Sequence, residues 1–207
     1  MISVEVVILA KSIKHKQYCV AGKCVANGVW VRPVASKDGA ELQKSNVLIS
    51  NNYGQFEAKP LQKVIMNFVQ HAPLIFQPEN FVVDGEPWRQ NYKINLSDLE
   101  KYLDKPNDIW GSGDKISAEA IRLGLMRIES SLYLLRVRNL LLEKLYFQGR
   151  SRRRVKFSYG CIDYDLSSTD PDFDSKIGKE DQLESIVCIS LGEVFSGFHF
   201  KIVAAIY

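Results

Sequence analysis

Runs of apolar residues, many alternating with polar ones, extend along most of the chain and are separated by clusters of turn residues. Short runs that are rich in β-branched and aromatic residues are typical of strands. They predict strands at residues 2–10, 19–25, 29–34, 63–70, 132–147, 154–159, 162–166, 185–191 and 198–207, with a shorter one within 81–92. Only residues 97–103 and 117–125 have a helical pattern. The sequence therefore predicts a mainly β fold with a few short helices.

The segment 104–115 (DKPNDIWGSGDK) concentrates Pro, Asn, Asp and Gly. Such a segment is typical of a boundary between structural units. Because short strands, tight turns and one or two small helices are expected on both sides of it, the plan suits two small barrels or one mixed β fold. We place the first unit at residues 1–110, with a helical insertion, and the second unit at residues 111–207.

The dipeptide Asn27-Gly28 predicts a hairpin with a two-residue type I′ loop, a turn that requires positive φ at both positions. With this loop Lys23 lies opposite Arg32, and Trp30 lies on the same face. The other face carries the expected core residues Cys24, Ala26, Val29 and Val31. Opposed cations destabilise a sheet by up to about 1 kcal/mol, which a bound anion would relieve, and an indole provides a surface for base stacking. Alternatively, Trp30 packs under a loop and both cations extend into water, or Trp30 is a buried packing residue and Arg32 pairs with an internal carboxylate.

A second hairpin is predicted around Gly160-Cys161, with a type II′ loop. One face then pairs six core residues: Tyr159 with Ile162, Phe157 with Tyr164, and Val155 with Leu166. On the other face Ser158 lies opposite Asp163 and Lys156 opposite Asp165. We interpret these pairs as ordinary cross-strand charge compensation.

Two clusters of basic residues suggest contacts with phosphate. Four arginines lie within GRSRRRVK at an expected hairpin tip, and lysines follow the first strand, where small oligonucleotide-binding barrels commonly line their groove. We expect 150–154, and also 192–197 between the last two strands, to be exposed loops. Solvated loops are the alternative interpretation. The candidate nucleic-acid-binding residues are Lys11, Lys14, Lys16, Lys23, Trp30, Arg32, Arg150, Arg152, Arg153 and Arg154.

Overall composition adds little to the case for a basic surface that binds nucleic acid. The 207 residues are 46% hydrophobic and 25% charged, as in a globular protein, and the net charge is only +3. Binding to nucleic acid must therefore depend on local clusters. The four dispersed cysteines indicate reduced thiols, and the sequence has neither a secretory signal nor an apolar run long enough to span a membrane. We expect a cytoplasmic protein with no membrane association.

Signals for catalysis or metal binding are weak. The segment DPDFDS resembles the beginning of a calcium loop, but its sixth and twelfth positions hold Ser175 and Asp181 in place of Gly and Glu. The carboxylates Asp163 and Asp165 with Lys156 would suit a nuclease, yet hairpin pairing already accounts for them. There is no Gly-rich phosphate loop and no Ser nucleophile elbow. The sequence thus predicts no enzyme activity, no metal and no cofactor.

Three segments resemble the dual OB-containing domain family. They are 18–34 (YCVAGKCVANGVWVRPV), 153–171 (RRVKFSYGCIDYDLSSTDP) and 188–207 (CISLGEVFSGFHFKIVAAIY), whereas 35–125 has no match. The resemblance implies two OB-like barrels in one chain and nucleic-acid binding, often in bacterial systems that counter phages or other invaders. Its motifs carry over to Cys19, Gly22, Trp30, Arg32, Pro33, Asp170 and Pro171, and to no catalytic residue.

The leading hypothesis is a non-catalytic protein that binds single-stranded or double-stranded nucleic acid. Two alternatives remain open: a protein-interaction subunit that docks on a partner enzyme, and a sensor of a small nucleotide. Only phosphate contacts would weaken steeply with salt, because they release counterions.

Overall fold

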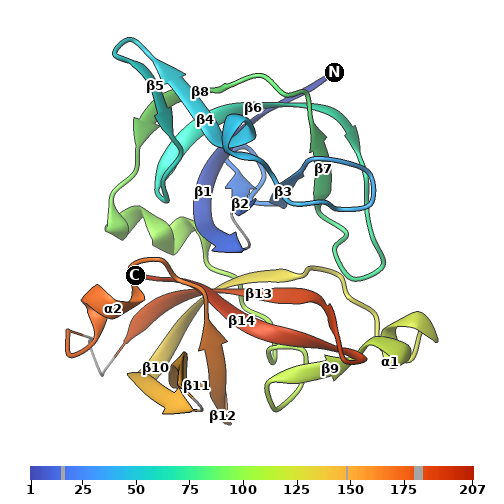
Figure 1. The fold of residues 1–207 in the computed structure, drawn as a ribbon, viewed down its shortest axis with the longest axis vertical. Helices are drawn as coiled ribbons and strands as arrows, with labels where there is room; N and C mark the ends of the chain where they lie inside the picture. The colour runs from blue at the N-terminus through green and yellow to red at the C-terminus, as the bar shows by residue number, and fades with distance from the viewer. Residues whose placement is uncertain (15–16, 148, 180–183) are drawn as a thin grey trace. The chain divides into compact units, whose positions relative to one another are not determined.

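The computed structural model describes residues 1–14, 17–147, 149–179 and 184–207. The chain divides into two compact units, shown in Figure 1. Unit 1 contains Met1–Tyr102 and Ile128–Ser131, and unit 2 contains Leu103–Arg127 and Leu132–Tyr207. The division thus falls between Tyr102 and Leu103, whereas composition places it after residue 110. Unit 1 is discontinuous in sequence. Its last segment, Ile128–Ser131, follows the first part of unit 2, Leu103–Arg127.

Unit 1 is a closed five-stranded barrel. Its strands are β1 (Ile2–Lys14), β2 (Gln17–Cys24), β3 (Trp30–Val34), β6 (Gln62–His71) and β7 (Asn80–Val83). Antiparallel pairing joins β1 to β2, β2 to β3, β7 to β6 and β6 to β1, while β3 and β7 pair in parallel. Alternate residues of these strands fill the interior, among them Val6, Ile8, Val20, Val31, Val64, Met66 and Phe68.

Three further strands and two short helices complete unit 1. The strands are β4 (Leu48–Asn51), β5 (Gly54–Glu57) and β8 (Trp88–Lys93), and the 3-10 helices are η1 (Lys44–Val47) and η2 (Leu96–Tyr102). β8 pairs with both β6 and β4, so these strands extend the barrel sheet. The sequence pattern does not predict β4 or β5, because their residues 48–57 (LISNNYGQFE) include too few apolar positions to give a strand pattern.

Unit 2 repeats the same closed barrel. Its strands are β10 (Leu132–Phe147), β11 (Arg150–Tyr159), β12 (Ile162–Ser168), β13 (Ser185–Phe195) and β14 (Phe198–Ile206). β12 and β14 pair in parallel, and the other pairings are antiparallel. A short strand β9 (Lys115–Ser117) pairs with β14 and leads into α1 (Ala118–Arg122). The helix α2 (Phe173–Lys176) places the fully buried Phe173 against the barrel.

Both units therefore have the topology of an OB fold, a five-stranded Greek-key barrel. In each unit the first strand pairs with the second and the fourth, and the third pairs in parallel with the fifth. The prediction of a mainly β chain with two OB-like barrels is confirmed.

The loop of the β2–β3 hairpin differs from its prediction. Cys24 N donates to Val29 O (2.9 Å) and Gly28 N donates to Cys24 O (2.8 Å), so the loop has four residues, and Lys23 pairs with Trp30. Asn27 Oδ1 accepts a hydrogen bond from Val29 N (3.1 Å), which favours this wider turn over type I′. The predicted register is wrong by two residues, so the residues that remain in the strands keep their faces. Ala26 and Val29, which were predicted in the core, are instead exposed.

The β11–β12 hairpin has the predicted register. Tyr159 pairs with Ile162 across a loop that begins with Gly160, whose φ of 60° suits the first position of a type II′ turn. The remaining predicted core pairs are also present, and Val155, Phe157, Tyr164 and Leu166 are buried. On the outer face, however, the ion pairs differ from the prediction: Lys156 Nζ binds Glu143 (2.8 Å), and Asp165 binds Arg154 (2.8 Å).

The calcium-like segment DPDFDS is fixed by a buried carboxylate. Asp170, only 2% exposed, accepts hydrogen bonds from the backbone N–H groups of Asp172 (2.7 Å) and Ile206 (2.8 Å) and from Lys176 Nζ (2.7 Å). Lys176 Nζ also donates to Ile206 O (2.7 Å). This carboxylate thus joins the segment after β12 to the end of β14.

Replacing Asp170 with alanine should destabilise unit 2. The substitution leaves the buried N–H of Ile206 without an acceptor, which costs about 1–3 kcal/mol. The matched control is Asp172→Ala, an exposed residue in the same segment, which should change stability by no more than about 0.5 kcal/mol. Denaturant unfolding of both variants measures the difference, and equal midpoints would contradict this role for Asp170.

A buried lysine lies inside the unit 2 barrel. Lys201 is 1% exposed, and its Nζ donates to Gly111 O (2.7 Å) and Ser112 O (3.1 Å), above the Tyr164 ring. Burial lowers the pKa of Lys201 to about 8, although the charges of Asp108 and Asp114 act to raise it. The ammonium group thereby holds the loop that precedes β9.

This lysine should make stability depend on pH between about 8 and 10.5. The folded chain loses the Lys201 proton at lower pH than the unfolded chain, so the unfolded state binds more protons in this range and the wild type gains stability as pH rises, by up to about 1.4 kcal/mol per pH unit. Lys201→Met lacks this contribution. The difference in unfolding free energy between wild type and variant should increase with pH, and a constant difference would contradict the lowered pKa.

Candidate nucleic-acid interface

The outer face of the β2–β3 hairpin is buried, not exposed as predicted. Lys23, Trp30 and Arg32 are only 3%, 5% and 8% exposed. Lys23 Nζ donates to Tyr102 O at the end of η2 (2.7 Å) and lies 5.1 Å from the centroid of the Trp30 ring. The prediction that these three residues form an exposed stacking and phosphate platform is therefore wrong. Their assignment to one face is correct, but alternation along a strand cannot reveal that later segments of the chain cover that face.

Arg32 takes part in a buried ionic cluster of unit 1. Its Nε lies 3.4 Å from Glu79 Oε1, and its Nη2 donates to Ser131 Oγ (2.9 Å). The Ser131 hydroxyl donates to the same carboxylate, and Ser131 N donates to Glu79 Oε2 (3.3 Å). Side-chain exposure is 10% for Arg32 and 5% for Glu79. The arginine of the WVRPV motif thus holds the segment 128–131 to the barrel.

The lysine cluster after the first strand is only partly described. Lys11 Nζ donates to Glu57 Oε1 (2.6 Å) and to Ala58 O (2.8 Å), and it lies 4.9 Å from the Tyr18 ring centroid. The hydrogen bond from Lys11 lowers the pKa of Glu57. Lys11 therefore fixes β1 to the end of β5. Lys16 and the side chain of Lys14 lie outside the described residues.

The arginine run belongs to strand β11 and not to the predicted loop. Arg153 Nη2 binds Asp174 (2.6 Å) on α2, and Arg154 Nε binds Asp165 (2.8 Å) on β12. Lys144 also binds Asp174 (3.1 Å). Hydrogen bonds from Lys144 and Arg153 lower the pKa of the Asp174 carboxyl group. Arg152 is exposed and pairs in register with Leu145, while the side chain of Arg150 lies outside the described residues.

The β10–β11 hairpin nonetheless has a local excess of basic residues. Residues 141–156 contain six Lys or Arg side chains and one acid, Glu143, a local excess larger than the net charge of +3 of the whole chain. Arg152, Arg154 and Lys156 alternate along the outer face of β11, opposite the partly exposed Leu145 and Leu141. The side chains of the two ion pairs on this face are 20–48% exposed, and surface pairs of this kind contribute only about 0–1 kcal/mol.

A second exposed surface of unit 2 was not predicted. Phe195, Phe198 and Phe200 share the outer face of β13 and β14, because Phe195 pairs with Phe198 and the next residue on that face is Phe200. Lys115 of β9 pairs with Phe200, and its Nζ lies 4.2 Å from the Phe198 ring centroid. The predicted loop 192–197 is in fact mostly strand, with a turn at Ser196-Gly197. The alternation of phenylalanines in FSGFHFK was the available signal.

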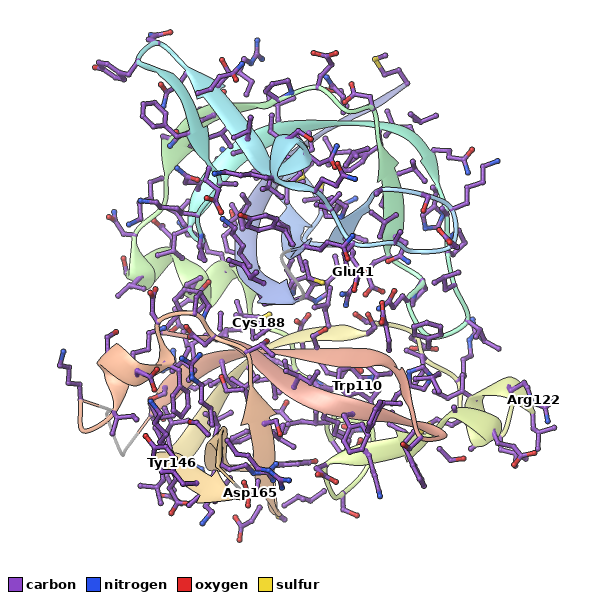
Figure 2. The ribbon with its side chains drawn as sticks, viewed as in Figure 1. Glu41, Trp110, Arg122, Tyr146, Asp165 and Cys188 are labelled. Atoms are coloured by element: carbon purple, nitrogen blue, oxygen red, sulfur yellow. The ribbon has the colours of Figure 1, made fainter. Side chains whose placement is uncertain are left out.

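Figure 1 shows the β10–β11 hairpin and the β13–β14 turn on different sides of unit 2. In Figure 2 Tyr146 and Asp165 lie on the side formed by β10, β11 and β12, and Arg122 on α1 lies on the opposite side. α1 follows β9 directly, and Ala118 N donates to Gly197 O (3.0 Å) at the β13–β14 turn. The basic hairpin and the three phenylalanines are therefore separate candidate surfaces.

No metal-binding or membrane-spanning feature accompanies these surfaces in the part of the chain that the structure describes. No group of three or more His, Cys, Asp or Glu side chains there could hold a metal ion. None of the helices described is long and apolar enough to cross a membrane.

Closed barrels of this topology place the protein in the OB-fold class, whose second and third strands commonly contact oligonucleotides. The chain matches the dual OB-containing domain family over residues 4–206 and belongs to it. No curated protein matches the sequence.

Arg32→Ala should destabilise unit 1 without altering an exposed binding surface. The substitution leaves the Glu79 carboxylate buried without its cation, at a cost of about 3–5 kcal/mol. Arg122→Ala is the matched control, since the Arg122–Glu119 pair is 70% exposed on both sides and should contribute less than about 1 kcal/mol. Thermal unfolding tests both variants. If Arg32→Ala melted like the wild type but bound oligonucleotides weakly, Arg32 would be a ligand residue after all.

Proposed function

We propose that this protein is a non-catalytic nucleic-acid-binding protein that contacts phosphate groups through the β10–β11 hairpin of unit 2. The observation that carries the proposal is the concentration of six cations against one acid in residues 141–156. Strand β11 is the second strand of an OB barrel, and its outer face belongs to the surface with which OB folds commonly bind oligonucleotides.

The side chains on this strand suit phosphate recognition. Arg154 donates to the Asp165 side chain (2.8 Å), the Asp165 carbonyl (2.5 Å) and the Ser167 hydroxyl (3.0 Å), so its guanidinium group is held on the outer face of the hairpin, and a phosphate would have to replace the Asp165 carboxylate. Arg152 and Lys156 lie two residues away on either side, on the same face. Three cations spaced along one strand could each contact a successive phosphate group of a nucleic-acid backbone.

The second and third strands of unit 1 support a division of roles between the units. Lys23 on β2 and Arg32 on β3 are directed to Tyr102, Glu79 and Ser131, within unit 1 itself. We therefore assign phosphate binding to unit 2. A role in bacterial systems that counter invaders, which the resemblance to the family implies, belongs to the same proposal, as does a cytoplasmic location.

Charge reversal at Arg152 tests the proposal. Arg152→Glu should weaken binding to an oligonucleotide roughly fivefold, about 1 kcal/mol, and should reduce the dependence of log K on log salt by about one unit. Lys37→Glu, the same charge change at an exposed residue of unit 1, should leave both quantities nearly unchanged. Fluorescence anisotropy at salt concentrations of about 50 and 200 mM measures them.

Two outcomes would count against the proposal. Flat anisotropy of the wild type at low salt would exclude nucleic-acid binding under these conditions. Equal losses for Arg152→Glu and Lys37→Glu would show that only the overall charge matters and that the β10–β11 hairpin is not the site.

A further inference from the structure

The outer face of the β13–β14 hairpin presents aromatic side chains at its tip. Phe195 is 70% exposed, and its ring centroid lies 6.4 Å from that of Phe200 at an interplanar angle of 55°. Phe198 and Phe200 are half-buried and share this face with Phe195. We call Phe195, Phe198, Phe200 and Lys115 the aromatic face.

The backbone beneath the aromatic face is held firmly. Ser196 and Gly197 have φ values of 49° and 81°, the two positive angles of a type I′ hairpin turn. β9 pairs with the beginning of β14, and His199, directed to the opposite side of the strand, forms a hydrogen bond through Nδ1 with Gly192 O (2.8 Å). Unit 2 therefore fixes the backbone that carries these rings before any ligand binds, which lowers the entropic cost of binding.

The chemistry of the aromatic face combines ring surfaces with one cation. Lys115 Nζ lies 4.2 Å from the Phe198 ring centroid and 5.9 Å from that of Phe200, in the range of cation–π contacts. Lys115 is exposed, so its ammonium group can also reach an anion in solution. Rings for stacking beside a cation for phosphate are the combination with which proteins bind single-stranded nucleic acid.

We propose that the aromatic face stacks unpaired bases of a single strand while Lys115 contacts the adjoining phosphate. The inference rests on the proposed function and goes further, because it assigns base contacts to a second surface and names single strands as the ligand. A duplex keeps its bases stacked on each other, so its interior ring faces are closed to Phe195. An apolar segment of a partner protein is the competing occupant, and it would not need a base.

The deciding probe is a pair of single-stranded oligodeoxynucleotides of equal length, one with thymine bases and one abasic throughout. Both carry the same phosphates, so they differ only in what the aromatic face can bind. Wild type should bind the base-containing strand about fivefold or more tightly, the lower limit for one stacked base. Phe195→Ala should lose this preference and keep its affinity for the abasic strand.

Two further variants make the result specific. Phe195→Trp should keep the preference, since indole stacks at least as well as phenyl. Val194→Ala removes a neighbouring side chain that is 52% exposed but lies on the alternate face of β13, and it should behave like the wild type. Thermal unfolding of each variant confirms that the fold is kept.

Phe195→Trp also provides a direct signal. The native tryptophans Trp30, Trp88 and Trp110 are 5%, 2% and 8% exposed, so the new indole would be the exposed one. Its emission should be quenched by the base-containing strand and unchanged by the abasic strand.

Each outcome has one interpretation. Equal binding of both strands by the wild type, or an unchanged preference in Phe195→Ala, would overturn the aromatic face as a base site while leaving phosphate binding by β11 intact. Absence of binding to either strand at low salt would overturn the proposed function and this inference together. Loss of the preference in Phe195→Ala, with its retention in Phe195→Trp and Val194→Ala, would establish the site.

Discussion

Each barrel closes through one short parallel strand pairing. The inward or outward direction of the side chains in the barrel depends on that pairing. In unit 1 residues 32–34 of β3 pair with residues 80–82 of β7, and in unit 2 residues 167 and 168 of β12 pair with residues 202 and 203 of β14. Without this contact each sheet would keep two long edges of unpaired N–H and C=O groups. Closure also fixes which alternate residues face inward, since a shift of one residue would turn every side chain to the other face.

The cations of β3 in unit 1 and of β11 in unit 2 have different surroundings in this fold. In unit 1 Arg32 lies in the closing strand β3, directly beside Asn80, and the preceding residue Glu79 neutralises it. In unit 2 the cations Arg152 and Lys156 lie on β11, where the long hairpin with β10 continues past the pairings with β13. One fold thus supports a buried ionic cluster in one unit and an exposed basic surface in the other.

Local patterns predicted the barrel strands but missed β4 and β5, and they were insufficient for the site. The II′ signal at Gly160 and the alternation from Val155 to Leu166 predicted a hairpin whose register is correct residue by residue. The faces of Trp30 and Arg32 were also correct, because alternation depends only on the strand. Their burial depends on Tyr102 and Ser131, which are distant in sequence, and no pattern around residue 30 records them. Likewise the partners of Arg153 and Arg154 come from α2 and β12, so a run without acids in sequence is partly neutralised in space.

The contact between Arg32 and Ser131 has a consequence for how the chain is made. Ser131 is the last residue of unit 1 and immediately precedes β10, so the ribosome adds it after residues 103–127 of unit 2. A nascent chain that ends near residue 110 contains every strand of the first barrel but lacks one hydrogen-bonding partner of its buried arginine. The first barrel can therefore complete its ionic cluster only when synthesis of the second has begun. Two separately expressed halves would divide an interaction that the intact chain keeps within one unit.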